Sequence, residues 1–331
     1  GSYFLSFLIA SANAIVFSLA RRERIPLFFV GCVCALFVLS FLYGIGRLRT
    51  PIAAPFSCSL VQGNIRQDMK WGKEMAAIIT ARYCSLTARE RDADLVVWPE
   101  TALPFVFEDA SWARQMVEQA SSQLKGYLLL GAFSREDDRF YNATFMLRHG
   151  RVTGLYRKVH LVPFGEYTPF LRYLPFREWV KRHVAELSSG EGHNPLKMLS
   201  GNVGVLICYE GIFPAISRKT VKNGAQILIN VTNDAWYDRS SAPYQHMAFY
   251  VFRAVETDRF VLRAANTGIS AIIDPRGRLI QRSRIFEETA VRGRFSFRST
   301  ETFYVRYGEW FLLLCLFYLL IILLVHARHL R

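Results

Sequence analysis

The stretch Gly204-Val-Leu-Ile-Cys-Tyr-Glu-Gly-Ile-Phe-Pro214 decides the fold. Its first four residues form a short apolar run that is typical of a buried strand, and Cys208 stands where this strand stops. Residues 209–211 then turn the chain, and a helix is predicted from Phe213 with Pro214 in its first turn. A cysteine on such a strand-to-helix turn lies near backbone N–H groups and a helix N-terminus, which lower a thiol pKa and stabilise an oxyanion. The alternative is that Cys208 is a small buried hydrophobic residue, as most free cysteines are.

The composition favours a membrane protein. Of the 331 residues 51% are hydrophobic, and the formal net charge is +14. A basic chain suits nucleic acid or an anionic membrane surface, but no Lys/Arg-rich arm for nucleic acid is present, so we expect a membrane and no nucleic acid as partner. The six cysteines form neither a disulfide framework nor a CxxC pattern. We therefore expect no metal and no cofactor.

Three apolar runs predict membrane-spanning helices. Residues 3–20 and 26–45 precede the main body of the chain, and residues 310–325 follow it. Each approaches the roughly 20 residues that cross a bilayer, and the last is flanked by aromatic residues as at a membrane interface. A pair of buried core helices is the alternative for the first two runs.

Arginines beside the spans predict the orientation. Arg21, Arg22 and Arg24 lie between the first two spans, and Arg328 and Arg331 follow the third. The positive-inside rule places both groups in the cytoplasm, so the long middle segment lies on the far side, which is the periplasm in a bacterium-like cell. The predicted organisation is two spans in 1–48, a catalytic domain in 49–308, and a third span with a cytoplasmic tail in 309–331.

The middle segment predicts one α/β domain. Strands are expected at residues 57–62, 94–98, 127–132, 201–208, 226–230 and 260–264, and helices at 73–89 and 245–258. A further helix is expected to bury the face that contains Trp112, Met116, Ala120 and Leu124. The dipeptide His149-Gly150 predicts a hairpin, and polar residues 177–200 predict a mobile loop or lid. Alternating strands and helices with extra hairpins indicate an α/β sandwich with outer helices.

Three polar residues stand where predicted strands end: Glu100, Lys158 and Cys208. A thiol nucleophile needs a base, for which Glu100 is the candidate. The tetrahedral oxyanion needs a positive donor, which Lys158 and a backbone N–H after Cys208 can supply. Taken singly, residues such as Glu100 and Lys158 are more often solvated surface charges; their shared placement at strand ends favours a site.

Several motifs resemble those of the nitrilase, or carbon-nitrogen hydrolase, superfamily and, within it, of the apolipoprotein N-acyltransferases. They are Trp98-Pro-Glu-Thr-Ala-Leu-Pro104, the segment Tyr156 to Tyr167, and Ile207-Cys-Tyr-Glu-Gly-Ile-Phe-Pro214. Further matches are Val61-Gln-Gly-Asn64, Asn230-Val-Thr-Asn-Asp-Ala-Trp236, Ala242-Pro-Tyr-Gln-His246 and Arg263-Ala-Ala-Asn-Thr-Gly-Ile-Ser-Ala271. The similarity runs along the whole chain.

The resemblance implies a nitrilase-like αββα sandwich and a set of residue roles. Glu100 would be the base, Lys158 the stabiliser of the intermediate and Cys208 the nucleophile. Supporting roles are implied for Trp71, Glu166, Tyr209 and Glu210. The alternatives are an ordinary aromatic contact for Trp71 and loop salt bridges for Glu166 and Glu210.

The implied reaction moves an acyl chain from a phospholipid, through a cysteine thioester, to the N-terminal amine of a diacylglyceryl apolipoprotein at the bacterial inner membrane. One departure is that the family carries about seven spans before the catalytic domain, whereas two precede it here. The chain is therefore expected to be truncated or split. Two rival functions remain: a membrane-tethered amidase or nitrilase, and a non-catalytic membrane subunit that binds lipoproteins.

Overall fold

A computed structural model of the protein describes residues 1–70, 72, 74–170 and 186–329. The chain divides into two compact units, which are described separately: residues 1–52 with 302–331, and residues 53–301. The domain boundaries expected from the sequence, after residues 48 and 308, stay a prediction. Trp71 and much of the predicted lid, residues 177–185, lie outside the described residues.

The first unit is helical. It contains α1 (Ser2–Ala20), α2 (Leu27–Arg49), α9 (Phe303–Tyr307) and α10 (Trp310–His329). Residues 2–20, 27–49 and 310–327 are long and apolar enough to cross a membrane, which confirms the three predicted spans as apolar helices. Within this unit α1 contacts both α2 and α10. The ring of Phe311 meets Phe4 and Phe7 edge-on, with centroids 5.3 and 5.4 Å apart.

One sheet of the second unit has the order β13-β1-β2-β4-β5-β6, with β3 also paired to β4. Its strands are β1 (Phe56–Gln62), β2 (Leu95–Val97), β3 (Leu103–Val106), β4 (Tyr127–Glu136), β5 (Arg139–Arg148), β6 (Arg151–Arg157) and β13 (Thr289–Phe295). Strands β1, β2 and β4 are parallel, whereas β5 and β6 form an antiparallel hairpin. The hairpin turns at His149-Gly150, where both residues have positive φ, as the dipeptide predicted.

The other sheet has the order β12-β11-β10-β9-β8-β7. Its strands are β7 (Leu196–Met198), β8 (Gly201–Ile207), β9 (Ile227–Thr232), β10 (Val261–Ala265), β11 (Ala271–Ile273) and β12 (Leu279–Arg282). The three central strands β8, β9 and β10 are parallel and fully buried or nearly so, which explains why they read as continuous apolar runs.

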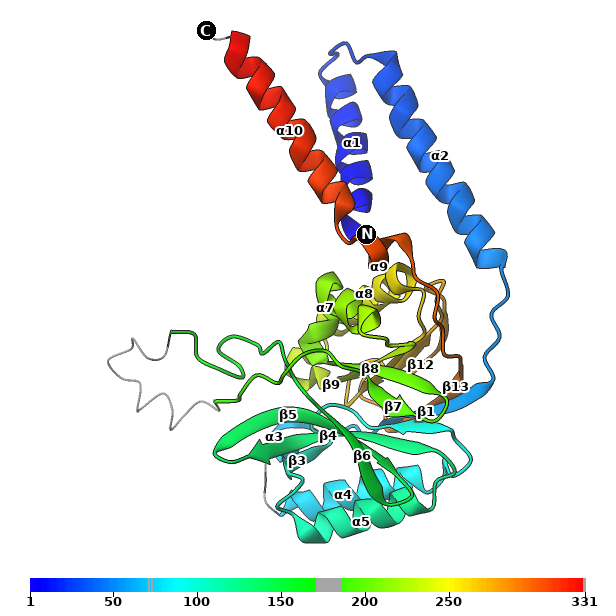
Figure 1. The fold of residues 1–331 in the computed structure, drawn as a ribbon, viewed down its shortest axis with the longest axis vertical. Coiled ribbons are helices and arrows are strands. Elements are labelled where there is room, and N and C mark those ends of the chain that lie inside the picture. Colours follow the sequence, from blue (N-terminus) through cyan, green and yellow to red (C-terminus); the bar gives the residue numbers. More distant parts are fainter. Residues whose placement is uncertain (71, 73, 171–185, 330–331) are drawn as a thin grey trace. The chain divides into compact units, whose positions relative to one another are not determined.

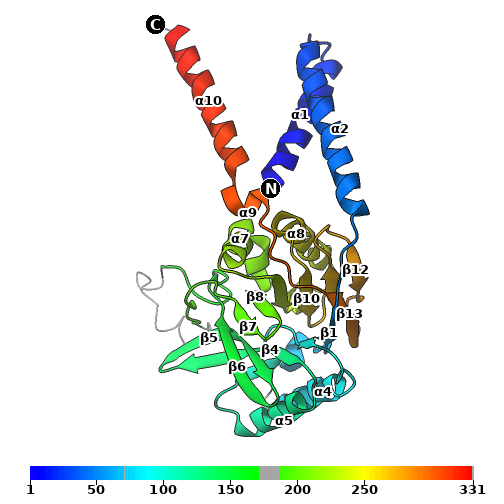
Figure 2. The same ribbon diagram turned by 45° about the vertical axis from the view of Figure 1, so that its right-hand side comes forward.

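The two sheets lie face to face between two layers of helices (Figures 1 and 2). β1 contacts β10 and β5 contacts β8 across the interface. Helices α4 (Met75–Thr87) and α5 (Ser111–Ser122) pack on the first sheet, and α7 (Pro214–Lys222) and α8 (Ala242–Thr257) pack on the second. Short helices are α3 (Gln67–Lys70) and the 3₁₀ turns η2 (Cys208–Ile212) and η3 (Asp234–Tyr237). This is the predicted αββα sandwich.

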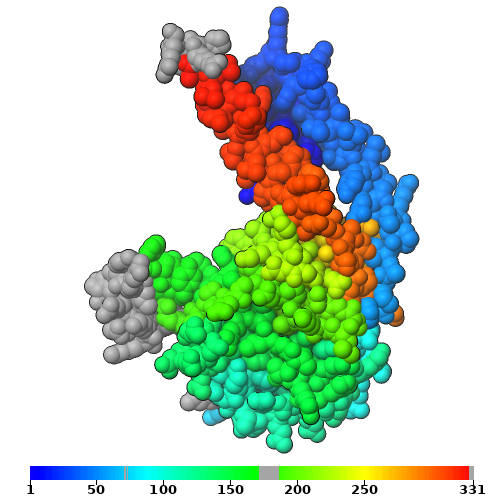
Figure 3. Space-filling view, viewed as in Figure 1, coloured from blue at the N-terminus to red at the C-terminus, as the bar shows by residue number. Residues whose placement is uncertain are grey.

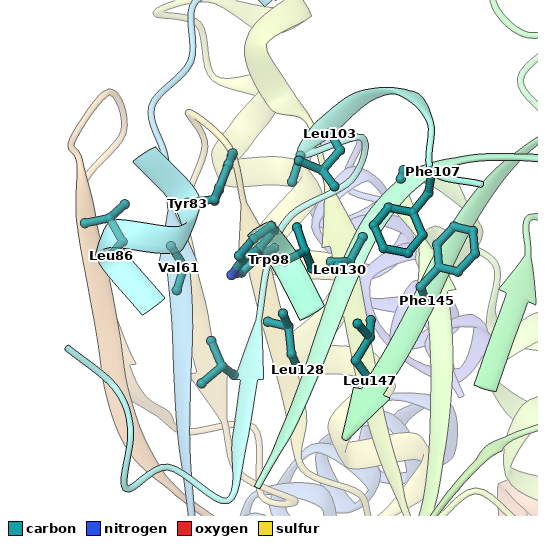
Figure 4. Close-up of a cluster of buried hydrophobic side chains, with 14 of the residues drawn as sticks. Val61, Tyr83, Leu86, Trp98, Leu103, Phe107, Leu128, Leu130, Phe145 and Leu147 are labelled. Carbon is teal, nitrogen blue, oxygen red and sulfur yellow. The ribbon is translucent and has the colours of Figure 1, made fainter. Parts of the chain in front are cut away.

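A buried apolar cluster joins the first sheet to its helices (Figure 4). Trp98, fully buried, stacks on Tyr83 of α4 at 5.0 Å and donates its indole N–H to Thr87. Phe107 packs on Phe145 of β5 with ring centroids 4.8 Å apart. The cluster includes Trp98, two residues before Glu100, and Ala102, two residues after it, so the core holds the chain on both sides of Glu100.

Three details differ from the sequence expectations. Helix α5 buries Ala113, Val117 and Ser121, one residue along from most of the predicted face. Leu124, just after the helix, is buried as predicted, whereas Trp112 is exposed and packs its ring on Phe105. Small residues face the sheet because the helix lies close to it. Strands β3, β7 and β13 were not predicted, and β7 falls inside the stretch expected to be a loop.

Segments distant in sequence, coloured cyan to yellow, share the surface of this unit (Figure 3).

Candidate active site

Glu100 is positioned by the turn that follows β2. Its side chain is 7% exposed, and Thr101 after it has φ +43°, a conformation that few non-glycine residues adopt. The backbone N–H of Asn233 donates to Oε2 at 2.9 Å, and the amide of Asn142 donates to Oε1 at 2.7 Å. Both carboxylate oxygens are therefore held in fixed positions by groups from the two different sheets.

Lys158 follows β6 and lies between two carboxylates. Its backbone N–H donates to the Asn142 carbonyl at 2.8 Å, so the hairpin partner β5 sets its position. The ammonium lies 2.8 Å from Glu166 Oε2 and 3.6 Å from Glu100 Oε1, and the side chain is 1% exposed. Burial alone would lower the pKa of Lys158, but the charges of Glu100, Cys208 and Glu166 outweigh burial and raise it. The neighbouring charges therefore favour the protonated ammonium.

Asn142 is a site residue that sequence reasoning missed. Its single Nδ2 donates to Glu100 at 2.7 Å and to Glu166 at 3.0 Å, so one amide spaces two carboxylates that would otherwise repel each other. The residue lies inside β5 with no strand end or motif to mark it. Only the pairing of β5 with β4 and β6 brings it to the site.

Cys208 stands at the sharp turn between β8 and α7, as predicted. Its φ is +49°, and its carbonyl accepts hydrogen bonds from the Tyr250 hydroxyl at 2.7 Å and from Asn230 Nδ2 at 3.4 Å. The expectation of a lowered thiol pKa is wrong for this structure. Burial raises the pKa of Cys208 to about 12, reinforced by the charge of Glu100 and opposed by Lys158. The thiol is therefore protonated at neutral pH and needs a base to become a nucleophile.

Glu210 ties the Cys208 turn to the Lys158 segment. Its Oε1 accepts from the backbone N–H groups of Val159 at 2.8 Å and His160 at 3.0 Å, and its Oε2 accepts from the N–H of Ile207 at 2.8 Å. The Tyr156 hydroxyl donates to the same carboxylate at 3.0 Å. Burial raises the pKa of Glu210, against these backbone donors. Among the described residues its partners are backbone N–H groups and the Tyr156 hydroxyl, and no loop salt bridge of the kind considered for it is found there.

Tyr209 and Glu166 have different partners in this arrangement. The Tyr209 ring, half-buried, meets Phe213 at 5.1 Å and His160 at 6.4 Å. Glu166 holds Lys158 and accepts from the N–H of Val162 through Oε2 at 2.9 Å. The salt bridge considered for Glu166 is therefore present, and its partner is the buried lysine.

Lys70, at the end of α3, is a second buried cation that sequence reasoning missed. Its ammonium donates to Thr101 Oγ1 at 2.6 Å and to the Glu100 carbonyl at 3.3 Å. Burial lowers the pKa of Lys70 to about 8, although Glu100 and Cys208 act against that shift. In the sequence Lys70 lies in a short polar segment next to Trp71, and nothing in that segment indicates that the lysine is buried.

The structure thus brings Lys158 into contact with both Glu100 and Glu166, and the charges of Glu100 and Lys158 act on Cys208. A carboxylate that can take a proton, a thiol and a fixed cation are the parts needed for nucleophilic acyl transfer.

Comparisons with known proteins bear on this arrangement. A family model described as carbon-nitrogen hydrolase matches residues 58–298. The chain is 41% identical over 331 residues to a protein from Geobacter metallireducens named apolipoprotein N-acyltransferase, covering 95% of this chain and 63% of that protein. A protein of the same name from Methylococcus capsulatus is 36% identical over 265 residues, covering 78% of this chain and 52% of the relative. The chain therefore spans about half to two thirds of the length of these relatives.

Solved structures share the fold. Nit3 of Saccharomyces cerevisiae, described as a member of the nitrilase superfamily, matches with a TM-score of 0.57 at 20% identity, covering 74% of this chain and 91% of that one. An amidase from Nesterenkonia sp. matches with a TM-score of 0.57 at 17% identity, covering 76% and 94%. At such identities the likeness concerns the fold alone.

Proposed function

Because the chain belongs to the carbon-nitrogen hydrolase family, we propose that it carries the catalytic part of a membrane acyltransferase. The donor is a membrane phospholipid and the acceptor is the N-terminal amine of a diacylglyceryl-cysteine in an apolipoprotein. The observation that carries the proposal is Cys208 beside Glu100 and Lys158 in a chain with three membrane-length apolar helices. The names of the relatives support acyl transfer to an apolipoprotein, and the phospholipid donor is part of the proposal.

In the first step the Cys208 sulfur attacks the ester carbonyl carbon of the phospholipid. Glu100 takes the thiol proton, which the raised pKa of Cys208 makes necessary. Lys158 and the Tyr209 backbone N–H stabilise the tetrahedral oxyanion; an ammonium has three N–H bonds and can hold Glu166 while donating to the oxyanion. The C–O bond then breaks, Glu100 returns the proton to the leaving oxygen, and a lysophospholipid departs.

In the second step the free amine attacks the thioester. Glu100 takes a proton from the attacking nitrogen, the C–S bond breaks, and the proton passes to the Cys208 sulfur. The product is an amide and the enzyme returns to its starting state. Glu166 and Glu210 support the reaction without taking part in the proton transfers. Glu166 fixes the Lys158 ammonium, and Glu210 fixes the backbone next to Lys158 and next to Cys208. We retain Trp71 and Tyr209 as substrate-contacting residues.

The proposed location is the bacterial inner membrane, with the catalytic unit in the periplasm. The chain is a membrane protein by its three apolar helices and the names of its relatives. The arginines between α1 and α2 and after α10 support cytoplasmic placement of those segments.

An acyl-enzyme trap tests the function. Protein given phospholipid without acceptor should accumulate an acyl group on the peptide that contains Cys208, and neutral hydroxylamine should remove it, because a thioester is cleaved where an oxygen ester resists. A diacylglyceryl peptide with a free amine should discharge the adduct into an amide, whereas an N-acetylated peptide should not.

Two variants sharpen this test. Cys208→Ala should carry no adduct, and Glu100→Gln should form it slowly because no base takes the thiol proton. A membrane-tethered amidase would give no lipid adduct, and a non-catalytic subunit would give none on any cysteine. An adduct that persists in Cys208→Ala would refute Cys208 as the nucleophile.

A further inference from the structure

A buried polar cluster lies directly behind Cys208 and belongs to none of the roles assigned above. Its centre is Asp234 of η3, whose side chain is fully buried. Oδ2 lies 2.8 Å from Nη2 of Arg263 on β10, and Oδ1 lies 3.0 Å from Nδ1 of His246 on α8. Gly268 makes room for this carboxylate, since a Cβ there would lie 2.7 Å from Asp234 Cγ. Asp234 is thus an anion compensated by a buried guanidinium and an imidazole.

Two chains of contact lead from Asp234 to Cys208. One runs through Thr232 at the end of β9, where the pairing of Ile207 with Val231 makes Cys208 and Thr232 the next residues on neighbouring strands. The Thr232 hydroxyl donates to Asp234 Oδ1 at 3.2 Å, and a hydrogen bond from Thr232 lowers the pKa of Cys208 against the effect of burial. The other runs through His246 to the Tyr250 hydroxyl at 3.5 Å, and this hydroxyl donates to the Cys208 carbonyl at 2.7 Å. The cluster therefore touches the cysteine at its sulfur and at its backbone.

The backbone contact acts on a conformation that is otherwise unfavourable. Cys208 has φ +49°, which costs a non-glycine residue on the order of 1–3 kcal/mol unless its surroundings impose it. Tyr250 is fully buried, lies across Gly211 of the same turn, and holds the Cys208 carbonyl. A methyl group on Gly211 would collide with the Tyr250 ring. This packing and hydrogen bond fix the turn in the conformation that presents the sulfur.

The contact at the sulfur changes with the reaction. A hydroxyl has one proton, so Thr232 cannot donate to Asp234 and to the sulfur at once. While the sulfur is a thiol it can donate to Thr232, which donates to Asp234. When Glu100 removes the thiol proton, the sulfur becomes a charged acceptor, and Thr232 can turn its proton towards it. Asp234 keeps its bonds from Arg263 and His246 and is not left unpaired.

We propose that Thr232 and Tyr250, both anchored through Asp234, are positioning residues for Cys208, and that Thr232 passes its hydrogen bond to the sulfur as the thiolate forms. The inference rests on the proposed function only in taking Cys208 as the nucleophile. Other charged or titratable groups that act on Cys208 are Glu100, Lys158, Asp234, Lys70, Tyr237 and Tyr250.

Alkylation by iodoacetamide tests the sulfur contact in the full chain without any lipid substrate. The rate is followed by mass spectrometry on the peptide containing Cys208, from pH 6 to 10. Thr232→Val keeps the side-chain shape and removes the hydroxyl, and we expect alkylation to be about 10- to 100-fold slower at each pH, the value of a hydrogen bond to a charged group. Thr232→Ser keeps the hydroxyl and should react within about threefold of the unchanged protein.

Thr257→Val is the matched control, because Thr257 is buried and donates to the Arg253 carbonyl at 2.7 Å, in α8 rather than at the sulfur. It should alkylate at the unchanged rate. Equal alkylation of Thr232→Val and the unchanged protein at every pH would overturn the role of Thr232.

The backbone contact is tested with Tyr250→Phe, which loses only the hydroxyl. We expect the rate of acyl-enzyme formation to fall by about tenfold or more at saturating phospholipid, with the half-saturating concentration unchanged and the thermal unfolding midpoint close to that of the unchanged protein. An unchanged acylation rate would overturn the role of Tyr250. Failure of the unchanged protein itself to acylate or alkylate at Cys208 would instead refute the proposed function.

Discussion

Lys158 is held by partners both at its ammonium and at its backbone. The ammonium lies between Glu166 and Glu100, and its backbone is held by Asn142 and, through Val159 and His160, by Glu210. A compact point charge fits this space, whereas a planar guanidinium directs its donors in a fork. Position as well as charge therefore matters at this residue.

We expect Lys158→Arg to lower the rate of acyl transfer by roughly 10²-fold or more, on the scale of losing an oxyanion donor. The protein should still insert into the membrane and fold, because the positive charge between the two carboxylates is kept. Activity on a diacylglyceryl peptide and the thermal unfolding midpoint are the two measurements. Near-normal activity in Lys158→Arg or in Lys158→Met would remove this lysine from the mechanism.

Lys70 predicts a pH dependence of stability. Burial lowers its pKa from 10.5 to about 8, so between these values the unfolded chain holds a proton that the folded chain has released. Stability therefore rises with pH in this window, by at most about 3 kcal/mol from this group. The unfolding midpoint of the unchanged protein, measured relative to Lys70→Met, should increase from pH 8 to pH 10. Exposed Lys197→Met is the control and should show no such trend; a decrease for Lys70 would contradict the assignment.

The sequence marks residues at strand ends better than residues inside elements. Glu100, Lys158 and Cys208 each follow an apolar run, so their convergence could be predicted, and Glu166 and Glu210 followed from the family resemblance. Asn142 lies within β5 and Lys70 at the end of a short polar helix, and only the strand pairing and burial reveal them. The raised pKa of Cys208 was missed because the turn alone suggests stabilisation of the thiolate, which lowers a thiol pKa. In the structure the effect of burial on this pKa is larger and raises it.

At the scale of elements, β4 presses against the turn that carries Glu100. A Cβ on Gly131 would lie 2.7 Å from the Thr101 nitrogen and 2.8 Å from Glu100 Cα. Both neighbours are backbone atoms, which cannot rotate away. The absence of a side chain at Gly131 therefore leaves room for Glu100, the proposed base.

Gly131→Ala should destabilise the protein by about 1–3 kcal/mol, as overpacking does, and should slow acyl-enzyme formation because Glu100 is displaced. Gly44→Ala on α2 is the matched control, since nothing lies within 4 Å of its added methyl group. Thermal unfolding and the acyl-enzyme rate measure the two effects. A Gly131→Ala protein with unchanged stability and an unchanged acyl-enzyme rate would contradict this prediction. It would show that the turn carrying Glu100 can shift to accept the added methyl group.

Element types were easier to predict than element faces. The parallel strands β8, β9 and β10 and the helices α4 and α8 follow from continuous or periodic apolar runs. The face of α5 was wrong by one residue, because large side chains were taken as the buried ones while Ala113 and Val117 pack on the sheet. Strands β3 and β13 escaped notice because their residues are half-exposed and mixed with arginine or proline.

At the scale of the whole molecule, the proposed orientation makes a labelling prediction. An impermeant thiol reagent applied to sealed cells should reach a cysteine introduced at Ser189, which is exposed in the catalytic unit. It should not reach one introduced at Arg22, in the segment between α1 and α2. Permeabilised cells provide the control in which both sites react. Labelling at Arg22 but not at Ser189 in sealed cells would reverse the topology.

The pairing of β1 with β13 means that the catalytic unit starts and finishes on neighbouring strands, with Phe56 opposite Phe295. The two ends of the unit therefore leave it side by side, from adjacent strands of one sheet. A domain whose two ends are adjacent can be inserted into another chain. It can also be circularly permuted, with its original ends joined and new ends opened elsewhere, without changing the strand pairing of either sheet.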